Sequence, residues 1–167
     1  RRLRRPGAPP PGGRRGHAGT FNPFGLLAEI RNFWDGTVIL AGAMSSGRDA
    51  AAAIATGADF AYMGTRFIAT AESNAQPEYK QMVCEVGAGD IVYTPAVSGV
   101  PASFMAPSLR NAGFDMEKLS DPAHVDFGEK LSMGDEAKAW KTIWSAGHGV
   151  AAIHDVPTVD ELVDRLE

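Results

Sequence analysis

The stretch VILAGAMSSGRDAAAAIATGADFAYMGTRF, from Val38 to Phe67, alternates apolar runs with turns of small residues. Residues 37–43 and 58–65 are apolar runs bounded by turns, a pattern typical of strands buried on both faces of a parallel sheet. Residues 47–56 are rich in alanine and precede Gly57, which suits the end of a helix. The stretch therefore predicts a strand–helix–strand unit with a right-handed crossover, and so an α/β fold.

Two turns of small residues follow the predicted strands, at Ala41–Gly47 and at Met63–Phe67. The carboxyl ends of parallel strands share one edge of a sheet, and ligands bind at that edge. Small residues let a ligand approach the backbone, and the N–H groups of a helix start favour an anion. Together the two turns can surround one phosphate, although tight turns after strands also arise for steric reasons alone. Neither turn carries a dinucleotide or P-loop fingerprint.

The charge of the chain is unevenly distributed. The 167 residues are 44% hydrophobic and 22% charged, which is ordinary for one soluble globular domain, and the formal net charge is −4. Residues 1–15 hold six arginines and no acidic residue. Removing these six from the 16 basic residues leaves 10 basic and 20 acidic side chains in residues 16–167. This acidic body argues against binding to nucleic acid.

Cysteine content and apolar runs indicate the cellular setting. Cys84 is the one cysteine, so it forms no internal disulfide, and we expect a buried or half-buried thiol. No apolar run approaches the ~18 residues of a membrane span. The basic N-terminus lacks the apolar region of a secretory signal. We therefore expect a cytoplasmic protein without a membrane partner.

Residues 1–16 differ sharply in composition from the rest of the chain. They contain six Arg, four Pro and four Gly, with Leu3 as the one large apolar residue. Such a segment buries too little surface to offset its ordering entropy, so we expect it to be disordered. Three interpretations stay open: a basic arm that binds phosphate groups, part of an organelle-targeting peptide, or a misread gene start. We favour the misread start because the composition changes abruptly at Gly16–His17.

Further helices are predicted on both sides of the central stretch. Residues 24–34 have an amphipathic pattern, with Asn22 suited to the cap and Pro23 to the first turn. In the central stretch, the helix cap falls on Ser45 or Ser46. The other predicted elements are a helix over 72–87 with a break near Pro77, an extended segment over 90–105, a short helix over 116–119, a helix over 134–147 with Trp140, Ile143 and Trp144 on one face, and a C-terminal helix that Thr158 caps with Glu161.

Four motifs, in order along the chain, closely resemble the nitronate monooxygenase family. They are GHAGT (16–20), VILAGAMSSGRDAAAAIATGAD (38–59), AYMGTRFIATAES (61–73) and IWSAGHGV (143–150). Members of this family are FMN-dependent (β/α)₈ TIM barrels. The resemblance implies that residues 17–167 are the C-terminal part of such a barrel: its last strands and helices, with a C-terminal helical segment. The first half of the barrel has no counterpart in these residues.

His17 matches the active-site histidine of the family, which follows a glycine equivalent to Gly16 in a G-G-H motif. The family oxidises alkyl nitronates with dioxygen to a carbonyl compound and nitrite, and the flavin carries the electron chemistry. With an ordinary pKa of about 6.5, a histidine beside the flavin can take the α-proton of a neutral nitroalkane or hydrogen-bond a nitronate. From the residues alone, a histidine in a glycine-rich loop is usually solvated. His148 is the second candidate, whereas His124 and His154 are expected at the surface.

The resemblance also implies a site for the FMN phosphate. The site is formed by two turns. The first comprises Gly42 and Ala43, and its alanine replaces a second glycine of the family motif. The second comprises Met63, Gly64 and Thr65. The Thr65 hydroxyl is expected to donate to the phosphate, and Arg66 either adds charge there or forms a surface salt bridge. A late G-Q-G motif reads Gly147–His148–Gly149, so that histidine replaces glutamine. We interpret the Trp140–Trp144 face as core rather than as a surface that stacks on the flavin. No His, Cys or carboxylate group shows metal-ligand spacing.

Two alternatives stay open beside the nitronate monooxygenase hypothesis. One is an FMN-dependent enoyl-acyl-carrier-protein reductase of the same flavoprotein group, and the other is a remnant without catalysis. Because family members are longer than this chain, we expect FMN binding by the chain alone to be weak or absent. Half a barrel also leaves unpaired sheet edges, so we expect pairing into a homodimer.

Overall fold

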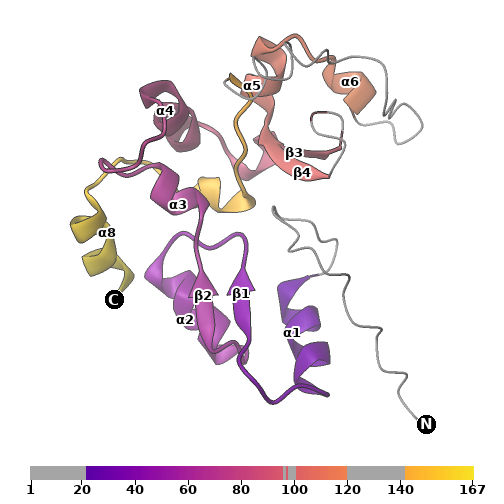
Figure 1. Ribbon diagram of the computed structural model, residues 1–167, viewed down its shortest axis with the longest axis vertical. Coiled ribbons are helices and arrows are strands. Elements are labelled where there is room, and N and C mark those ends of the chain that lie inside the picture. Colours follow the sequence, from indigo (N-terminus) through magenta and orange to yellow (C-terminus); the bar gives the residue numbers. More distant parts are fainter. Residues whose placement is uncertain (1–21, 96, 98–100, 120–141) are drawn as a thin grey trace.

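The computed structural model describes residues 22–95, 97, 101–119 and 142–167 (Figure 1). One group of elements comprises α1 (Pro23–Arg31), β1 (Ile39–Ala41), α2 (Gly47–Ala55) and β2 (Phe60–Tyr62). A second group comprises α3 (Thr65–Ile68), α4 (Pro77–Glu85), the 3₁₀ turn η1 (Ala88–Asp90), β3 (Ile91–Thr94), β4 (Ala102–Met105), α5 (Ala106–Asn111) and α6 (Met116–Leu119). The chain then returns through η3 (His148–Ala152) to α8 (Val159–Leu166).

The central stretch forms the predicted strand–helix–strand unit. β1 and β2 pair in parallel, with Ile39 opposite Phe60 and Ala41 opposite Tyr62, and α2 connects them. Figure 1 shows α2 packed against one face of this two-stranded sheet. The predicted α/β class is therefore confirmed for this part of the chain.

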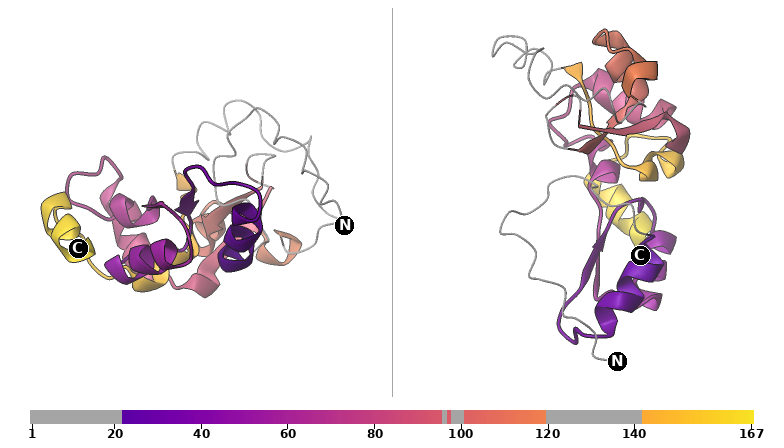
Figure 2. Two further views of the ribbon diagram at one scale, coloured as in Figure 1. Left: turned by 90° about the horizontal axis from the view of Figure 1, so that it is seen from below. Right: turned by 90° about the vertical axis from the view of Figure 1, so that its right-hand side faces the viewer.

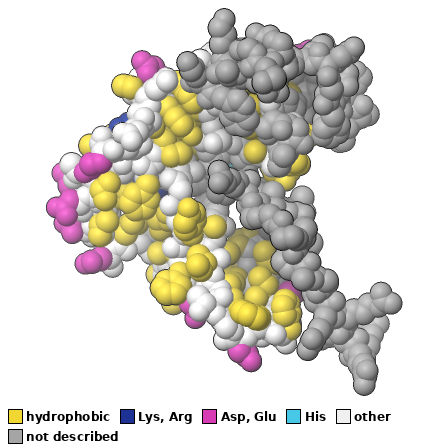
Figure 3. All heavy atoms as spheres, in the orientation of Figure 1, with side chains coloured by type: hydrophobic (Ala, Val, Ile, Leu, Met, Phe, Trp, Pro, Cys, Tyr) yellow, Lys and Arg dark blue, Asp and Glu magenta, His cyan; other side chains and the backbone are white. Residues whose placement is uncertain are grey.

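The prediction that both strands are buried on both faces is wrong. The side chains of Ile39, Phe60 and Tyr62 are 60%, 59% and 64% exposed, whereas Leu40 and Ala61 pack into an apolar cluster under the helices. That cluster has Leu27, Met44, Ala53 and Ala58 at its centre. Figure 3 shows hydrophobic side chains gathered where β1 and β2 lie. The two strands have a layer of helices on one face, and no described residue forms a layer on the other.

The first helix is shorter than its sequence pattern predicts. Asn22 caps α1 by accepting a 2.9 Å hydrogen bond from the Phe24 N–H, and Pro23 occupies the first turn, as predicted. The helix ends at Arg31, so Phe33 and Trp34 lie beyond it and are exposed. Arg31 connects the end of α1 to the loop between α2 and β2. Its guanidinium donates to the Gly57 carbonyl oxygen at 2.7 Å and forms an ion pair with Asp59 at 2.7 Å.

The extended segment over 90–105 is an antiparallel hairpin of β3 and β4, rather than another strand of the parallel sheet. The preceding helix begins at Pro77, so the part of the predicted helix before that proline is a loop. Residues Ile143 and Trp144 are not helical, in contrast to the prediction, and Trp140 lies outside the described residues. The short helix over 116–119 is confirmed.

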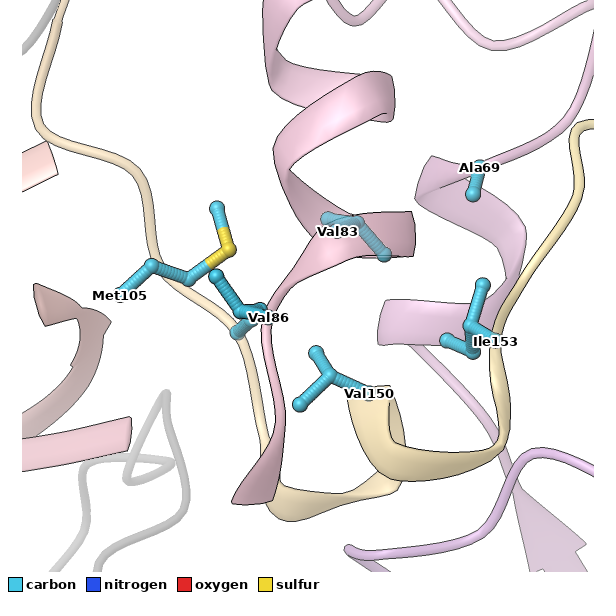
Figure 4. Close-up of a cluster of buried hydrophobic side chains, with 7 residues drawn as sticks. Ala69, Val83, Val86, Met105, Val150 and Ile153 are labelled. Carbon is cyan, nitrogen blue, oxygen red and sulfur yellow. The ribbon is translucent and has the colours of Figure 1, made fainter. Parts of the chain in front are cut away.

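The largest apolar cluster joins the second group of elements to the returning chain. Figure 4 shows side chains from α4, β4 and η3 directed toward one another. The cluster comprises Ala69, Val83, Val86, Met105, Ala146, Val150 and Ile153. Trp144 packs on its edge with its ring stacked on Tyr79, at 5.2 Å between ring centroids, which confirms the interpretation of Trp144 as core. Cys84 also packs against this cluster and is half-buried, as predicted, and burial raises the pKa of its thiol.

The C-terminal helix α8 begins at the predicted cap. The Thr158 hydroxyl accepts a 3.2 Å hydrogen bond from the Glu161 N–H, and the Glu161 carboxylate accepts one from the Thr158 N–H. Figure 2 shows α8 returning to lie beside α2. The approach is close, because a Cβ on Gly47 would lie 2.5 Å from the Leu166 carbonyl oxygen. The C-terminal segment therefore packs against the start of the helix that follows the first turn.

Candidate functional site

The two turns lie side by side at one edge of the sheet. Ala41 at the end of β1 is paired with Tyr62 at the end of β2, so Gly42 and Met63 leave the sheet from neighbouring positions. The predicted proximity of the turns is therefore confirmed. This is the edge where parallel strands carry their ligand-binding loops.

The first turn has a left-handed backbone at two consecutive residues. Gly42 has a φ of 108° and Ala43 a φ of 56°. The left-handed region is open to glycine but unfavourable for a residue with a Cβ, which is the physical reason for glycine in such a turn. Ala43 thus has a backbone conformation that favours glycine, the residue that the family motif has at this position. Among the described residues, none accepts a hydrogen bond from the N–H groups of Ala43 and Met44, so these donors are available to a ligand.

The next two N–H groups of this turn are already occupied. The N–H groups of Ser45 and Ser46 both donate to Asp49 Oδ2, each at 2.9 Å. The Ser46 hydroxyl accepts from the Asp49 N–H, which completes a capping box at the start of α2. Burial acts to raise the pKa of Asp49, but these hydrogen bonds outweigh it and lower that pKa below its ordinary value. Asp49 was not among the predicted site residues, although Ser46 and Asp49 have the three-residue spacing of a capping box.

The second turn leaves open space next to its backbone. Apart from its two chain neighbours, no described residue has an atom within 4 Å of the position that a Cβ on Gly64 would occupy. Thr65 begins the short helix α3 and is buried. Its hydroxyl oxygen accepts a 3.0 Å hydrogen bond from the Gly147 N–H. A bare backbone, open space and a hydroxyl group together fit the phosphate end of a bound cofactor.

A third segment, Gly147–Gly149, lies against both turns. The Ser45 hydroxyl donates a 2.8 Å hydrogen bond to the Gly149 carbonyl oxygen, so one end of the segment is fixed to the first turn. The other end is fixed to the second turn through Thr65. A Cβ on Gly149 would lie 2.5 Å from Ser45 Oγ and 3.3 Å from the Ala43 carbonyl carbon. His148, between the two fixed glycines, is exposed.

The predicted salt bridge of Arg66 forms, but Arg66 is not a surface residue. Its side chain is only 4% exposed, so its salt bridge is not one between surface residues. The guanidinium lies 3.0 Å from the Asp155 carboxylate and also donates to the Asp155 carbonyl oxygen. Because Asp155 occupies this cation, Arg66 joins the second turn to the segment before α8.

Two predicted site residues, His17 and Gly16, lie outside the described residues, as does His124. His154 is exposed, as predicted. Among the described residues, no three His, Cys, Asp or Glu side chains lie close enough together to hold a metal ion. None of the helices in the described part of the chain has the length and apolar character needed to cross a bilayer.

Comparisons with known proteins identify the family of the chain. The sequence profile of the family described as nitronate monooxygenase matches residues 8–167. A nitronate monooxygenase of Paraburkholderia phytofirmans is 32% identical over 167 aligned residues, which cover 91% of this chain and 45% of that protein. The chain thus spans about half the length of the curated relatives that it matches.

Two solved structures share the fold. FabK from Thermotoga maritima is 27% identical with a TM-score of 0.68, over 90% of this chain and 49% of that chain. Nitroalkane oxidase from Streptomyces ansochromogenes is 29% identical with a TM-score of 0.65, over 86% and 42% of the two chains. These likenesses support the α/β class, and the assignment of this chain to the last part of a (β/α)₈ barrel stays a prediction. With a profile match that includes both turns and the third segment, the chain belongs to the nitronate monooxygenase family.

Proposed function

We propose that this chain forms the phosphate-binding part of an FMN-dependent enzyme that oxidises alkyl nitronates with dioxygen to a carbonyl compound and nitrite. The observation that carries the proposal is the common edge of the two turns, which follow the paired residues Ala41 and Tyr62. The family of the chain supports the same assignment. Because the chain spans about half of its curated relatives, the activity of the whole enzyme is part of the proposal.

The residues of the two turns would hold the phosphate of FMN mainly through their backbone. At the left-handed turn, the N–H groups of Ala43 and Met44 have no acceptor among the described residues, and Gly64 leaves room for an anion. The Thr65 hydroxyl oxygen accepts from Gly147, and its proton is still available to a phosphate oxygen. Bound FMN supplies the electron transfer and oxygen chemistry of this reaction.

His17 is the proposed catalytic residue, on the basis of the family motif alone. It would take the α-proton of a neutral nitroalkane, or donate a hydrogen bond to the anionic nitronate, which needs no deprotonation. By holding the phosphate, the two turns would orient the cofactor relative to this histidine. Both proposed substrates, the nitronate and dioxygen, are small molecules.

Flavin binding by the full chain tests the proposal. We expect FMN to bind more tightly than riboflavin, which has the same ring without the phosphate, because the proposed contacts of the two turns are with the phosphate. Binding is followed by quenching of flavin fluorescence, and retention by flavin absorbance after desalting. Equal affinity for the two flavins, or no binding of either, would contradict a phosphate site at the two turns.

An enoyl-acyl-carrier-protein reductase activity is the second candidate. The TM-scores of FabK and of nitroalkane oxidase, 0.68 and 0.65, are too similar to favour one activity from the fold. Under anaerobic conditions, NADH would bleach the bound flavin of such a reductase, whereas a nitronate would bleach that of a nitronate monooxygenase. Flavin bound without bleaching by either compound would indicate a remnant that binds the cofactor without catalysis.

A further inference from the structure

We infer that Ser45 and Thr65 are positioning residues: their two hydroxyls fix the segment Gly147–Gly149 across both turns, and this segment forms the third side of the phosphate site. The inference rests on the proposed function, because that function assigns the two turns to a phosphate. It adds a role to Thr65 and gives one to Ser45, which the family motifs did not single out.

Ser45 is fixed at two of its polar groups. Its N–H donates to Asp49 at 2.9 Å, and its hydroxyl donates to the Gly149 carbonyl oxygen at 2.8 Å. The residue is only 5% exposed, so water does not compete for this hydroxyl. Ser45 therefore connects the capped start of α2 to Gly149 through two hydrogen bonds.

Thr65 makes the matching connection from the second turn. It is 7% exposed, and its hydroxyl oxygen accepts the Gly147 N–H at 3.0 Å. An N–H buried without an acceptor is costly, so Gly147 depends on this oxygen. The hydroxyl proton of Thr65 is not used in this hydrogen bond and can be donated to a ligand.

The two hydrogen bonds together make one rigid unit of three backbone segments. Gly147 and Gly149 are two residues apart, yet their partners belong to different turns. The segment also packs closely against the first turn, since there is no space for a Cβ at Gly149. A site held in its binding geometry before the ligand arrives loses less conformational entropy on binding. The clamp formed by Ser45 and Thr65 should therefore strengthen binding of a phosphate-bearing ligand.

The first experiment measures the clamp without any ligand, by hydrogen–deuterium exchange of the Gly147 amide in the full chain. Thr65→Val removes the acceptor at nearly constant volume, and Thr65→Ser restores it. We expect rapid exchange of Gly147 in Thr65→Val and protection close to wild type in Thr65→Ser. Thr56→Val is the matched control, since the Thr56 hydroxyl bonds within α2, to Ala52 and Ala53, away from the site.

The second experiment measures affinities for FMN and for riboflavin. We expect Ser45→Ala and Thr65→Val to bind FMN about fivefold to tenfold more weakly, the factor expected for losing one hydrogen bond. Riboflavin affinity should change by less than about twofold, because it carries no phosphate. Thr65→Ser should recover FMN affinity, which a general loss of stability would not allow.

The outcomes separate the inference from the proposed function. The inference would be overturned if the Gly147 amide stays protected from exchange in Thr65→Val. It would also be overturned if Ser45→Ala and Thr65→Val bind FMN as tightly as wild type. A different result is that the wild-type protein fails to bind FMN while protection of Gly147 still depends on Thr65. This result would overturn the proposed function and leave the clamp supported.

Discussion

The guanidinium of Arg66 lies 3.0 Å from the carboxylate of Asp155, and the side chain of Arg66 is almost fully buried whereas that of Asp155 is 49% exposed. The pair therefore connects a buried cation of the second turn to a residue at the surface. Arg165 of α8 also donates to the Asp155 carboxylate. One carboxylate thus holds both the turn and the C-terminal helix in place.

Removal of Asp155 should destabilise the protein, because it leaves the buried Arg66 cation without its partner. We expect Asp155→Ala to lower the free energy of unfolding by about 1–3 kcal/mol, as measured by urea denaturation. Asp164→Ala, at an exposed position of α8, is the control and should change it by less than about 0.5 kcal/mol. Equal effects of the two substitutions would show that the Arg66–Asp155 pair contributes nothing specific.

The same carboxylate should make stability depend on acid pH. The hydrogen bond from Arg165 and the charge of Arg66 hold the pKa of Asp155 below its ordinary value of 3.8, despite partial burial. Because the pKa is lower in the folded state, the contribution is fully present above the ordinary value and is lost as pH falls through the folded value. Melting curves of wild type and Asp155→Asn should therefore converge as pH falls below about 3.8. A difference that stays constant down to pH 2.5 would contradict this linkage.

Replacing Ala43 with glycine should stabilise the first turn. Ala43 has a φ of 56°, in a region where a Cβ is unfavourable by about 1–2 kcal/mol. Glycine removes this cost but also adds freedom to the unfolded chain, so we expect Ala43→Gly to raise the free energy of unfolding by up to about 1 kcal/mol. Ala50→Gly, inside α2, should lower it by about 1 kcal/mol. Loss of stability in both variants would mean that Ala43 is not strained.

Gly149→Ala should disturb the third segment. The new Cβ would lie 2.5 Å from Ser45 Oγ and 3.3 Å from the backbone of the first turn, so atoms must shift. We expect a loss of about 1–3 kcal/mol in the free energy of unfolding, typical of overpacking. Gly89→Ala has no atom within 4 Å of its Cβ position and should leave stability unchanged or slightly higher. If urea denaturation gives the two variants equal stability, the close contact at Gly149 is wrong.

The exposed face of the two-stranded sheet should make the chain associate with itself. Sedimentation velocity is expected to show larger species as protein concentration rises. Phe60→Ser removes an aromatic ring from this face and should shift the balance toward monomer. Phe24→Ser is a matched control, since Phe24 is also 59% exposed but lies on α1. Equal shifts for both variants, or a monomer at every concentration, would contradict association through the sheet face.

Local sequence determined the elements that depend on near neighbours. The caps at Asn22 and Thr158 were predictable because each side chain reaches an N–H two or three residues away. The strand–helix–strand unit and its two turns were predictable from the apolar runs and small residues, and the family resemblance assigned both turns to the FMN phosphate. Hydrophobic pattern alone could not end α1 at Arg31, because Phe33 continues the apolar period without a buried surface to meet.

Only the tertiary structure decided which distant segments complete the site. The bonds from Ser45 to Gly149 and from Gly147 to Thr65 join residues 104 and 82 positions apart, and Arg66 meets Asp155 across 89 positions. No local pattern encodes these contacts, since they depend on where the chain returns after α6. The exposure of Ile39 and Phe60 likewise depends on whether a second layer covers the sheet. An apolar strand can have the same sequence pattern with one face covered or with both.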